Sequence, residues 1–303
     1  MLPIAPSLEA LLGEPVEQMV ELGSPWATST QTELATLASG RQVVVQRPRG
    51  DASAQLTIRR RLRLGRLLPT VAPWLPVPDV LAGVAAGPQP FLVTRFIPGV
   101  SGRELLADDR GAERLGGLMG ELATRLARVP TRGMRLGDLW NDPNGLAAAA
   151  RRWLDTSSAE LGADGARALD RRLRRVPRDL AGEAPVFAHG DFAPVNVVLR
   201  DGKVVALLDF ERARIAHPLF DAAWWRWILR HHHRERWAAA WPAFRATAGL
   251  DDSPETTARL DLLAALQCLE MVHGSRARPA ATRREWVARL LRVLGWEDDD
   301  PGT

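Results

Sequence analysis

The spacing of hydrophobic residues divides the chain near residue 98. Before that point, apolar and β-branched runs separated by Gly and Pro predict short strands at 16–22, 28–37, 43–45 and 91–97. One segment differs, because residues 52–68 place leucines among five arginines and predict a helix that Pro69 ends. The first part of the chain is therefore predicted to be a small β-rich unit with one helix.

Beyond Gly99 the pattern becomes helical. Residues 101–129 and 145–175 are rich in Leu, Ala and Arg and predict amphipathic helices. A strand-rich insert follows at about 186–209, and helical patterns then resume. We therefore predict an α+β chain with a β-rich N-terminal lobe, residues 1–98, and a larger, mainly helical C-terminal lobe, residues 99–303.

Composition narrows the class of protein. The 303 residues are 46% hydrophobic and 25% charged, which excludes wholesale disorder. The 40 basic and 36 acidic residues leave a net charge of +4, too modest to argue for nucleic acid. Lys203 is the only lysine and Cys268 the only cysteine, so an intramolecular disulfide is excluded. With neither a signal-peptide pattern nor a membrane-length apolar run, we expect a cytoplasmic chain with no membrane partner.

The segment 188–211 carries the candidate chemistry. Asp201-Gly202 lies between two β-branched runs and predicts a two-residue hairpin turn. Arg200 would then face Lys203, and Asn196 would lie opposite Leu207 with Asp209 one step further on the same face. Such diagonal neighbours are about 7–8 Å apart, so the two oxygen-bearing side chains suit a hard cation such as Mg²⁺.

An Asp, an Asn five residues later and a second Asp after a hairpin form the pattern used for kinase phosphoryl transfer. His189-Gly-Asp-Phe-Ala-Pro-Val-Asn196, followed by Leu208-Asp-Phe-Glu211, resembles the catalytic segment of the aminoglycoside phosphotransferase and choline kinase group. The resemblance extends loosely over residues 15–295. It includes a lobe-connecting strand at 91–99 and the loop Pro218-Leu-Phe-Asp221. It implies a two-lobed, protein-kinase-like fold.

The resemblance also implies roles for individual residues. Asp191 would be the catalytic base and His189 would orient its loop, while Asn196 and Asp209 would bind Mg²⁺. The expected partners are ATP or GTP as phosphoryl donor and a small-molecule hydroxyl as acceptor; the sequence carries no indication of oligomeric state. Further positions are implied to support the catalytic loop (Asp221), to border the metal site or face solvent (Glu211), and to contact the nucleotide (Ser24, Gln46, Arg47, Arg95 and Ile97).

The chain departs from the family pattern at the nucleotide phosphates. The family usually has Lys, and sometimes Arg, at the end of the third strand and Glu on the following helix. Here the strand reads Val44-Val-Gln46-Arg47, and there is no acidic residue between Asp51 and Asp79. We expect Arg47, or one of Arg59 to Arg61, to contact the phosphates instead. The alternative is impaired phosphate binding, in a catalytically weak nucleotide-binding protein.

Three other features leave alternatives open. Consecutive histidines at 231–233 point about 100° apart on a helix, which favours a solvated or partly packed face over a metal site. The arginine-rich helix 52–68 fits a solvated surface or phosphate contact better than nucleic-acid binding, which stays the weaker alternative. His217 stands where the family usually has Asp. The acceptor is open between an aminoglycoside-like or macrolide-like antibiotic and a metabolite alcohol.

Overall fold

The computed structural model describes residues 5–22, 30–49, 52–85, 90–134, 136–137 and 139–295. Ser24 and residues 296–303 lie outside the described residues. The chain forms two compact units: one joins Met1–Ser101 with Val195–Arg212, and the other joins Gly102–Pro194 with Ala213–Thr303. The hairpin segment 195–212, which the division at residue 98 assigns to the helical lobe, clusters with the first unit, where residues 198–199 pair with Val100 and Ser101.

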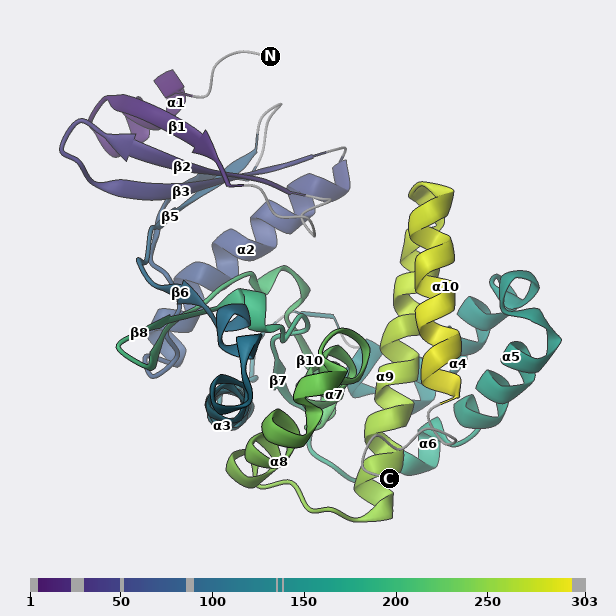
Figure 1. Ribbon diagram of the computed structural model, residues 1–303. Helices are drawn as coiled ribbons and strands as arrows, with labels where there is room; N and C mark the ends of the chain where they lie inside the picture. The colour runs from purple at the N-terminus through teal and green to yellow at the C-terminus, as the bar shows by residue number, and fades with distance from the viewer. Residues whose placement is uncertain are drawn as a thin grey trace. The chain divides into compact units, whose positions relative to one another are not determined.

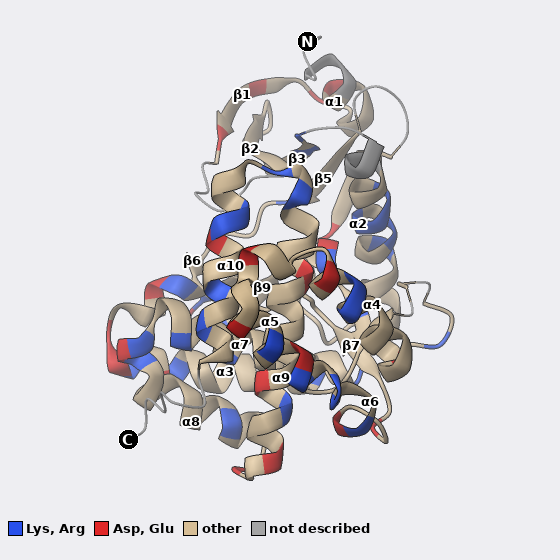
Figure 2. Cartoon of the chain, turned by 90° about the vertical axis from the view of Figure 1, so that its right-hand side faces the viewer, with Lys and Arg blue, Asp and Glu red and all other residues tan. Residues whose placement is uncertain are grey.

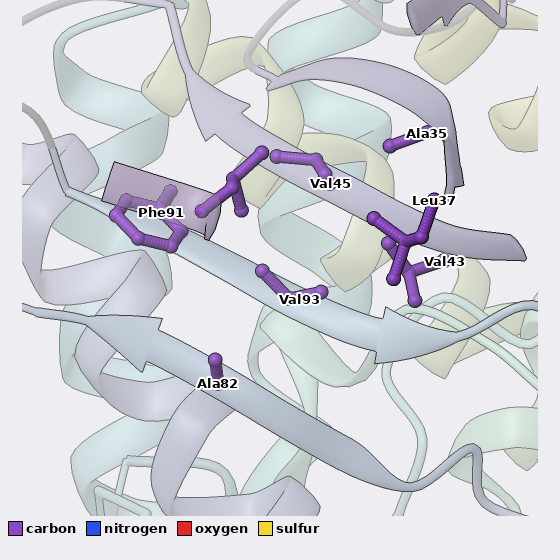
Figure 3. Close-up of a cluster of buried hydrophobic side chains, with 8 residues drawn as sticks. Ala35, Leu37, Val43, Val45, Ala82, Phe91 and Val93 are labelled. Atoms are coloured by element: carbon purple, nitrogen blue, oxygen red, sulfur yellow. The ribbon is translucent and has the colours of Figure 1, made fainter. Parts of the chain in front are cut away.

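The first unit is built on an antiparallel sheet (Figure 1). Its strands, in spatial order, are β1 (Val16–Glu21), β2 (Thr30–Leu37), β3 (Gln42–Pro48), β5 (Phe91–Arg95) and β4 (Val80–Val84). Alternate residues of these strands share one face, where Val43, Val45 and Val93 are fully buried. Leu8 of helix α1 (Ala5–Leu12) joins this core, whose sheet residues are shown in Figure 3.

Helix α2 (Ala52–Val71) packs through Ile58 and Leu62 against Leu92 of β5. Leu92 and the core residue Val93 alternate along the strand, so α2 covers the sheet face opposite the first core. The arginines of α2 stand out in blue in Figure 2. The helix continues to Val71 and does not end at Pro69 as the sequence predicted. The fixed φ of proline is compatible with helical geometry, and its missing N–H removes one bond near the end of the helix.

The hairpin confirms the predicted turn but corrects its register. Strands β6 (Val100–Ser101), β8 (Val197–Arg200) and β9 (Lys203–Leu207) form a small antiparallel sheet. Arg200 lies opposite Lys203, as predicted. The register then shifts between Val198 and Leu199, so that Val197 lies opposite Leu207. A bulge on β9 adds one unpaired residue there, which turns every later position to the other face.

The second unit is mainly helical. Its α-helices are α3 (Asp109–Ala127), α4 (Pro143–Asp155), α5 (Ser158–Leu173), α6 (Val176–Asp179), α7 (Phe220–His232), α8 (Trp237–Ala248), α9 (Pro254–Gly274) and α10 (Ala280–Leu294). A two-stranded sheet pairs β7 (Val186–Ala188) with β10 (Arg214–Ala216). Short 3-10 turns of the second unit are η1 (Gly102–Ala107), η2 (Leu139–Asn141), η5 (Arg234–Arg236) and η6 (Ser275–Ala277). Of the other two, η4 (Phe210–Arg212) belongs to the first unit and η3 (Pro194–Asn196) crosses the boundary between the units.

Two local features set the packing of these helices. The helix predicted over 145–175 is broken twice: at Ser157, with φ of −126° and ψ of 0°, and again inside α5 at Gly162, with φ of 69° and ψ of 170°. Helices α3 and α8 pack closely because Gly116 and Gly120 bring the two backbones together; a Cβ at Gly116 would lie 2.1 Å from the carbonyl oxygen of Ala240. Helices α9 and α10 lie side by side (Figure 1). None of the described helices is long and apolar enough to cross a membrane.

Candidate active site

A buried arginine in the first unit connects helix α2 to the segment after the hairpin. The Nη2 atom of Arg61 lies 2.6 Å from Asp209 Oδ1 and 2.6 Å from Glu211 Oε2. Its Nη1 atom donates to Gln46 Oε1 on β3 at 3.0 Å. The Arg61 side chain is only 4% exposed, so its contacts with both carboxylates are strong, charge-assisted hydrogen bonds. Strand, helix and post-hairpin segment thus meet at one guanidinium.

The two carboxylates depend on that positive charge. Burial raises the pKa of Glu211, and the neighbouring charge of Asp209 raises it further, while Arg61 and Arg212 oppose both effects. Without a cation, two adjacent carboxylates would repel one another in a poorly solvated site. Glu211 therefore borders the candidate metal position through Arg61 and Asp209 and does not simply face solvent.

Arg47 lies elsewhere. It forms an ion pair with Glu33 on strand β2 and shares a sheet face with Val45, opposite the face of Gln46. Of the arginines considered as phosphate ligands, Arg61 joins the acidic pair and Arg47 does not.

The positions implied for the nucleotide base lie at the end of β5. Arg95, its last residue, makes an exposed ion pair with Asp79 at 2.9 Å, and Ile97 follows the strand half-buried.

The candidate metal ligands Asn196 and Asp209 flank the hairpin. The backbone oxygen of Asn196 accepts from the amide of Leu208 at 2.7 Å, which closes the strand pair at this end. Asp209 adopts a left-handed conformation, with φ of 63°, and does not continue the strand as the predicted register required. Its Oδ1 atom accepts from Arg61 and from the amide of Glu211, and among the described residues no hydrogen bond reaches its Oδ2.

These oxygen donors fit a hard cation. The Asp209 carboxylate and the Asn196 amide oxygen are ligand types that Mg²⁺ prefers, and Asp209 Oδ2 keeps its acceptor capacity. The described residues contain no cluster of three or more His, Cys, Asp or Glu side chains that would hold a metal alone. This composition suits an ion that takes its remaining ligands from water and phosphate.

The second unit contains the candidate catalytic loop, which begins where β7 ends. The carboxylate of Asp221, at the start of α7, accepts from the amides of His189 at 2.7 Å and Gly190 at 3.0 Å. Gly190 has φ of 84°, a conformation that favours glycine. Burial raises the pKa of Asp221, and the hydrogen bonds from the two amides oppose the rise. Asp221 therefore holds the loop through its backbone.

Asp191 is held at both its backbone and its side chain. Its amide donates to His189 Nδ1 at 3.3 Å, and its Oδ1 atom accepts from Trp224 Nε1 at 3.1 Å. Asp191 is half-buried whereas His189 is fully buried, so the carboxylate is the group that remains accessible. A fixed, accessible carboxylate suits proton acceptance from a bound hydroxyl.

Sequence reasoning missed the contact of Trp224 and did not separate Arg61 from its neighbours. Trp224 follows Asp221 by three residues, so helical spacing alone places both side chains on the loop-facing side of α7. No comparable local signal marks Arg61, whose partners are 148 and 150 residues away in sequence.

The histidines outside the loop have packing roles. His231 stacks on Trp227 with ring centroids 5.0 Å apart, in agreement with a partly packed face. Burial lowers the pKa of His217 to about 4. Its Nδ1 atom accepts from the amide of Leu219 at 3.1 Å, so the neutral ring holds the loop before α7.

Comparison with solved structures shows the same fold in antibiotic phosphotransferases. The APH(2")-IIia complex with GDP and kanamycin has a TM-score of 0.74 and 16% identity, covering 98% of this chain and all of that one. APH(4)-Ia with AMP-PNP and hygromycin B has 0.71 and 16%, covering 99% and 100%. Macrolide 2'-phosphotransferase MphH from Brachybacterium faecium has 0.65 and 18%, covering 94% and 95%.

At the level of sequence, no curated protein matches the chain. A family model does match, that of the phosphotransferase enzyme family, APH, over residues 27–263. This range contains the catalytic loop, the hairpin and α2. The α+β, kinase-like fold predicted from the sequence is confirmed, and the chain belongs to the phosphotransferase enzyme family.

Proposed function

We propose that this phosphotransferase moves the γ-phosphoryl group of ATP or GTP to a hydroxyl of a small molecule. The observation that carries the proposal is the catalytic loop, in which Asp221 fixes the backbone and Trp224 holds the carboxylate of Asp191. The similar solved structures contain GDP with kanamycin and AMP-PNP with hygromycin B. This supports a nucleotide as donor and an antibiotic-like molecule as acceptor. A metabolite alcohol would use the same chemistry.

In the proposed reaction, Asp191 orients the acceptor hydroxyl and accepts its proton. The acceptor oxygen forms a bond to the γ-phosphorus, and the bond from that phosphorus to the β–γ bridging oxygen breaks, releasing the nucleoside diphosphate. Mg²⁺ held by Asn196 and Asp209 would neutralise phosphate charge. The protein contributes mainly positioning and electrostatics, as in other phosphoryl transfers.

Arg61 is the proposed phosphate-binding cation. It lies beside Asp209 and donates to Gln46 on the third strand, β3. A guanidinium can make two parallel hydrogen bonds to a phosphate, so one arginine from α2 can serve where lysine is absent. In this proposal Arg61 exchanges part of its contact with Glu211 for a nucleotide phosphate oxygen.

The same ion pair favours a second candidate function. Because Arg61 holds Asp209 Oδ1 in the absence of nucleotide, it competes for the carboxylate that would bind Mg²⁺. If that competition dominates, the chain binds nucleotide weakly and transfers phosphate poorly. The predicted difference is in metal-dependent nucleotide affinity, which can be measured without knowing the acceptor.

The activity test incubates the protein with Mg²⁺ and ATP or GTP and a panel of an aminoglycoside, a macrolide and simple alcohols. We expect acceptor-dependent release of nucleoside diphosphate and a phosphorylated product by mass spectrometry. Asp191→Ala should reduce turnover by about 10²–10⁴-fold, since it removes the proton acceptor, while nucleotide affinity stays close to that of the wild type. Normal turnover in Asp191→Ala would contradict the assigned role.

A further inference from the structure

A second candidate binding site lies in the helical unit. A cavity of about 520 Å³ is lined by residues from the C-terminal end of α5 and the turn after it, from α7, α8 and α9, and from the loop between α8 and α9. This volume is within the usual range for small-molecule sites. Every residue that lines the cavity belongs to the second unit.

Regular helical spacing brings these side chains together. Trp237, Trp241 and Arg245 follow one another at intervals of four on α8, and Arg226 and Arg230 have the same spacing on α7. Residues four apart share one face of a helix. Each of these helices therefore presents one continuous face to the cavity.

The cavity lining is strongly basic. Its charged side chains are two aspartates, Asp252 and Asp261, and five arginines, an excess of three positive charges: Arg172, Arg175, Arg226, Arg230 and Arg245. Arg226 is paired with Asp261, Arg245 with Asp252, and Arg175 with Asp179, which lies outside the lining. Arg172 donates to the carbonyl oxygen of Leu294. The Nε atom of Arg245 is buried and has no hydrogen-bond partner among the described residues. The lining thus combines excess charge with an unsatisfied donor.

Aromatic rings hold part of this charge in place. The guanidinium carbon of Arg226 lies 5.7 Å from the ring centroid of Trp237 and 6.0 Å from that of Trp241. The guanidinium carbon of Arg230 lies 5.7 Å from the Trp237 ring. Stacking on tryptophan restrains an arginine side chain. Such preorganisation lowers the entropy lost on binding.

The cavity lies on the side of α7 away from the catalytic loop. Asp221 and Trp224 contact that loop, whereas Arg226 and Arg230 line the cavity. At 100° per residue the two pairs point roughly 170° apart around the helix axis. A ligand in this cavity is therefore not the acceptor held by Asp191.

We propose that this cavity binds a small polyvalent oxyanion, either a phosphorylated or a polycarboxylated molecule. Five arginines provide the charge, and guanidinium groups bind phosphate and carboxylate oxygens in the same two-pronged way. The first turn of α9, which includes the lining residue Pro254, adds the partial positive charge of a helix N-terminus. Binding here requires neither nucleotide nor acceptor.

The test is isothermal titration calorimetry of the wild-type protein with inorganic pyrophosphate in magnesium-free buffer, followed by citrate. We expect saturable binding of pyrophosphate at this site. Arg230→Gln and Arg245→Gln should each weaken it by roughly tenfold, the loss expected for a charge-assisted hydrogen bond. The matched control is Arg128→Gln, which removes one exposed charge outside the cavity and should leave the affinity unchanged. Melting temperatures verify that each variant is folded.

Citrate distinguishes the two ligand types. Comparable binding of citrate supports a site for polyvalent anions in general, and binding of pyrophosphate alone supports a phosphorylated ligand. The variant Arg61→Gln shows whether the binding heat comes from the cavity or from the site at Arg61 in the first unit. If Arg61→Gln abolishes pyrophosphate binding while both cavity variants retain wild-type affinity, the anion binds in the first unit and the proposal is wrong. Failure of the wild type to bind either anion would also overturn it.

Discussion

At the scale of single residues, Arg61 holds the key electrostatic position. It is buried, and it contacts both Asp209 and Glu211, whose charges would otherwise repel one another. The sequence predicts that an arginine takes the place of the missing lysine, but α2 contains several arginines. The choice depends on which side of α2 faces Gln46 and the post-hairpin segment, and that is decided by tertiary packing.

Arg61→Gln is expected to weaken Mg²⁺–ATP binding by about tenfold or more, because a charged phosphate ligand becomes neutral. Arg47→Gln is the matched comparison, since it removes the same charge from the opposite sheet face. Equilibrium titration with a fluorescent ATP analogue measures both variants. A large loss of affinity in Arg47→Gln, with none in Arg61→Gln, would reverse this assignment.

His217 predicts a pH dependence of stability. Burial lowers its pKa to about 4 in the folded protein, with Arg259 contributing, whereas an unfolded histidine has its ordinary value of 6.5. Between these two pKa values the unfolded protein binds more protons than the folded protein. The stabilising contribution of His217 to the free energy of unfolding is therefore complete above pH 6.5 and is lost as the pH falls toward 4. The full difference between the two pKa values corresponds to about 3 kcal/mol in the free energy of unfolding.

The test compares His217→Asn with the wild type, because an Asn side-chain oxygen can accept from the Leu219 amide without titrating. Urea unfolding between pH 7.5 and 4.5 should show a smaller loss of unfolding free energy in the variant. Identical pH profiles for both proteins would contradict the neutral, buried role of His217.

At the scale of elements, two glycines explain how α3 and α8 approach. Gly116→Ala would place its Cβ 2.1 Å from the carbonyl oxygen of Ala240, so the helices must separate. We expect a destabilisation of roughly 1–3 kcal/mol, the usual range for overpacking.

Gly117→Ala provides the control on the same helix. Its Cβ would meet only a methyl of Thr247 at 3.8 Å, an ordinary contact. Since alanine favours helix over glycine, this variant should gain up to about 1 kcal/mol. Chemical denaturation should therefore show a lower free energy of unfolding for Gly116→Ala and a higher one for Gly117→Ala. Equal changes in the two variants would show that the close approach of α3 and α8 does not limit packing.

Elements were more predictable from sequence than their exact registers and ends. Alternation and turn chemistry predicted β1, β2, β3 and β5 and the Asp201-Gly202 turn, because these depend on local preferences, but they did not predict β4. The bulge in β9, which moved the partner of Leu207 from Asn196 to Val197, has no local signal of comparable strength. The break at Ser157 is not marked by Gly or Pro, and α2 continues past Pro69 because proline costs only one backbone hydrogen bond near the end of the helix.

At the scale of the whole molecule, the candidate residues are shared between the two units. Gln46, Arg61 and Asp209 belong to the first, and Asp191 and Asp221 belong to the second. The chain passes from one unit to the other at Pro194–Val195, within the catalytic motif itself. The motif was readable because its spacing is local, whereas the inclusion of segment 195–212 in the first unit follows from pairing with residues far earlier in the chain.

The most direct test of the proposed kinase site is thermal unfolding with ATP and with GTP, each with and without Mg²⁺, for the wild type and Asp209→Asn. A ligand at one hundred times its dissociation constant adds about 2.7 kcal/mol of stability, enough to raise the melting temperature by several degrees. We predict a Mg²⁺-dependent rise for at least one nucleotide in the wild type and its loss in Asp209→Asn, each protein being compared with its own ligand-free state. No rise with either nucleotide, or an equal rise in the variant, would contradict a metal–nucleotide site at Asp209.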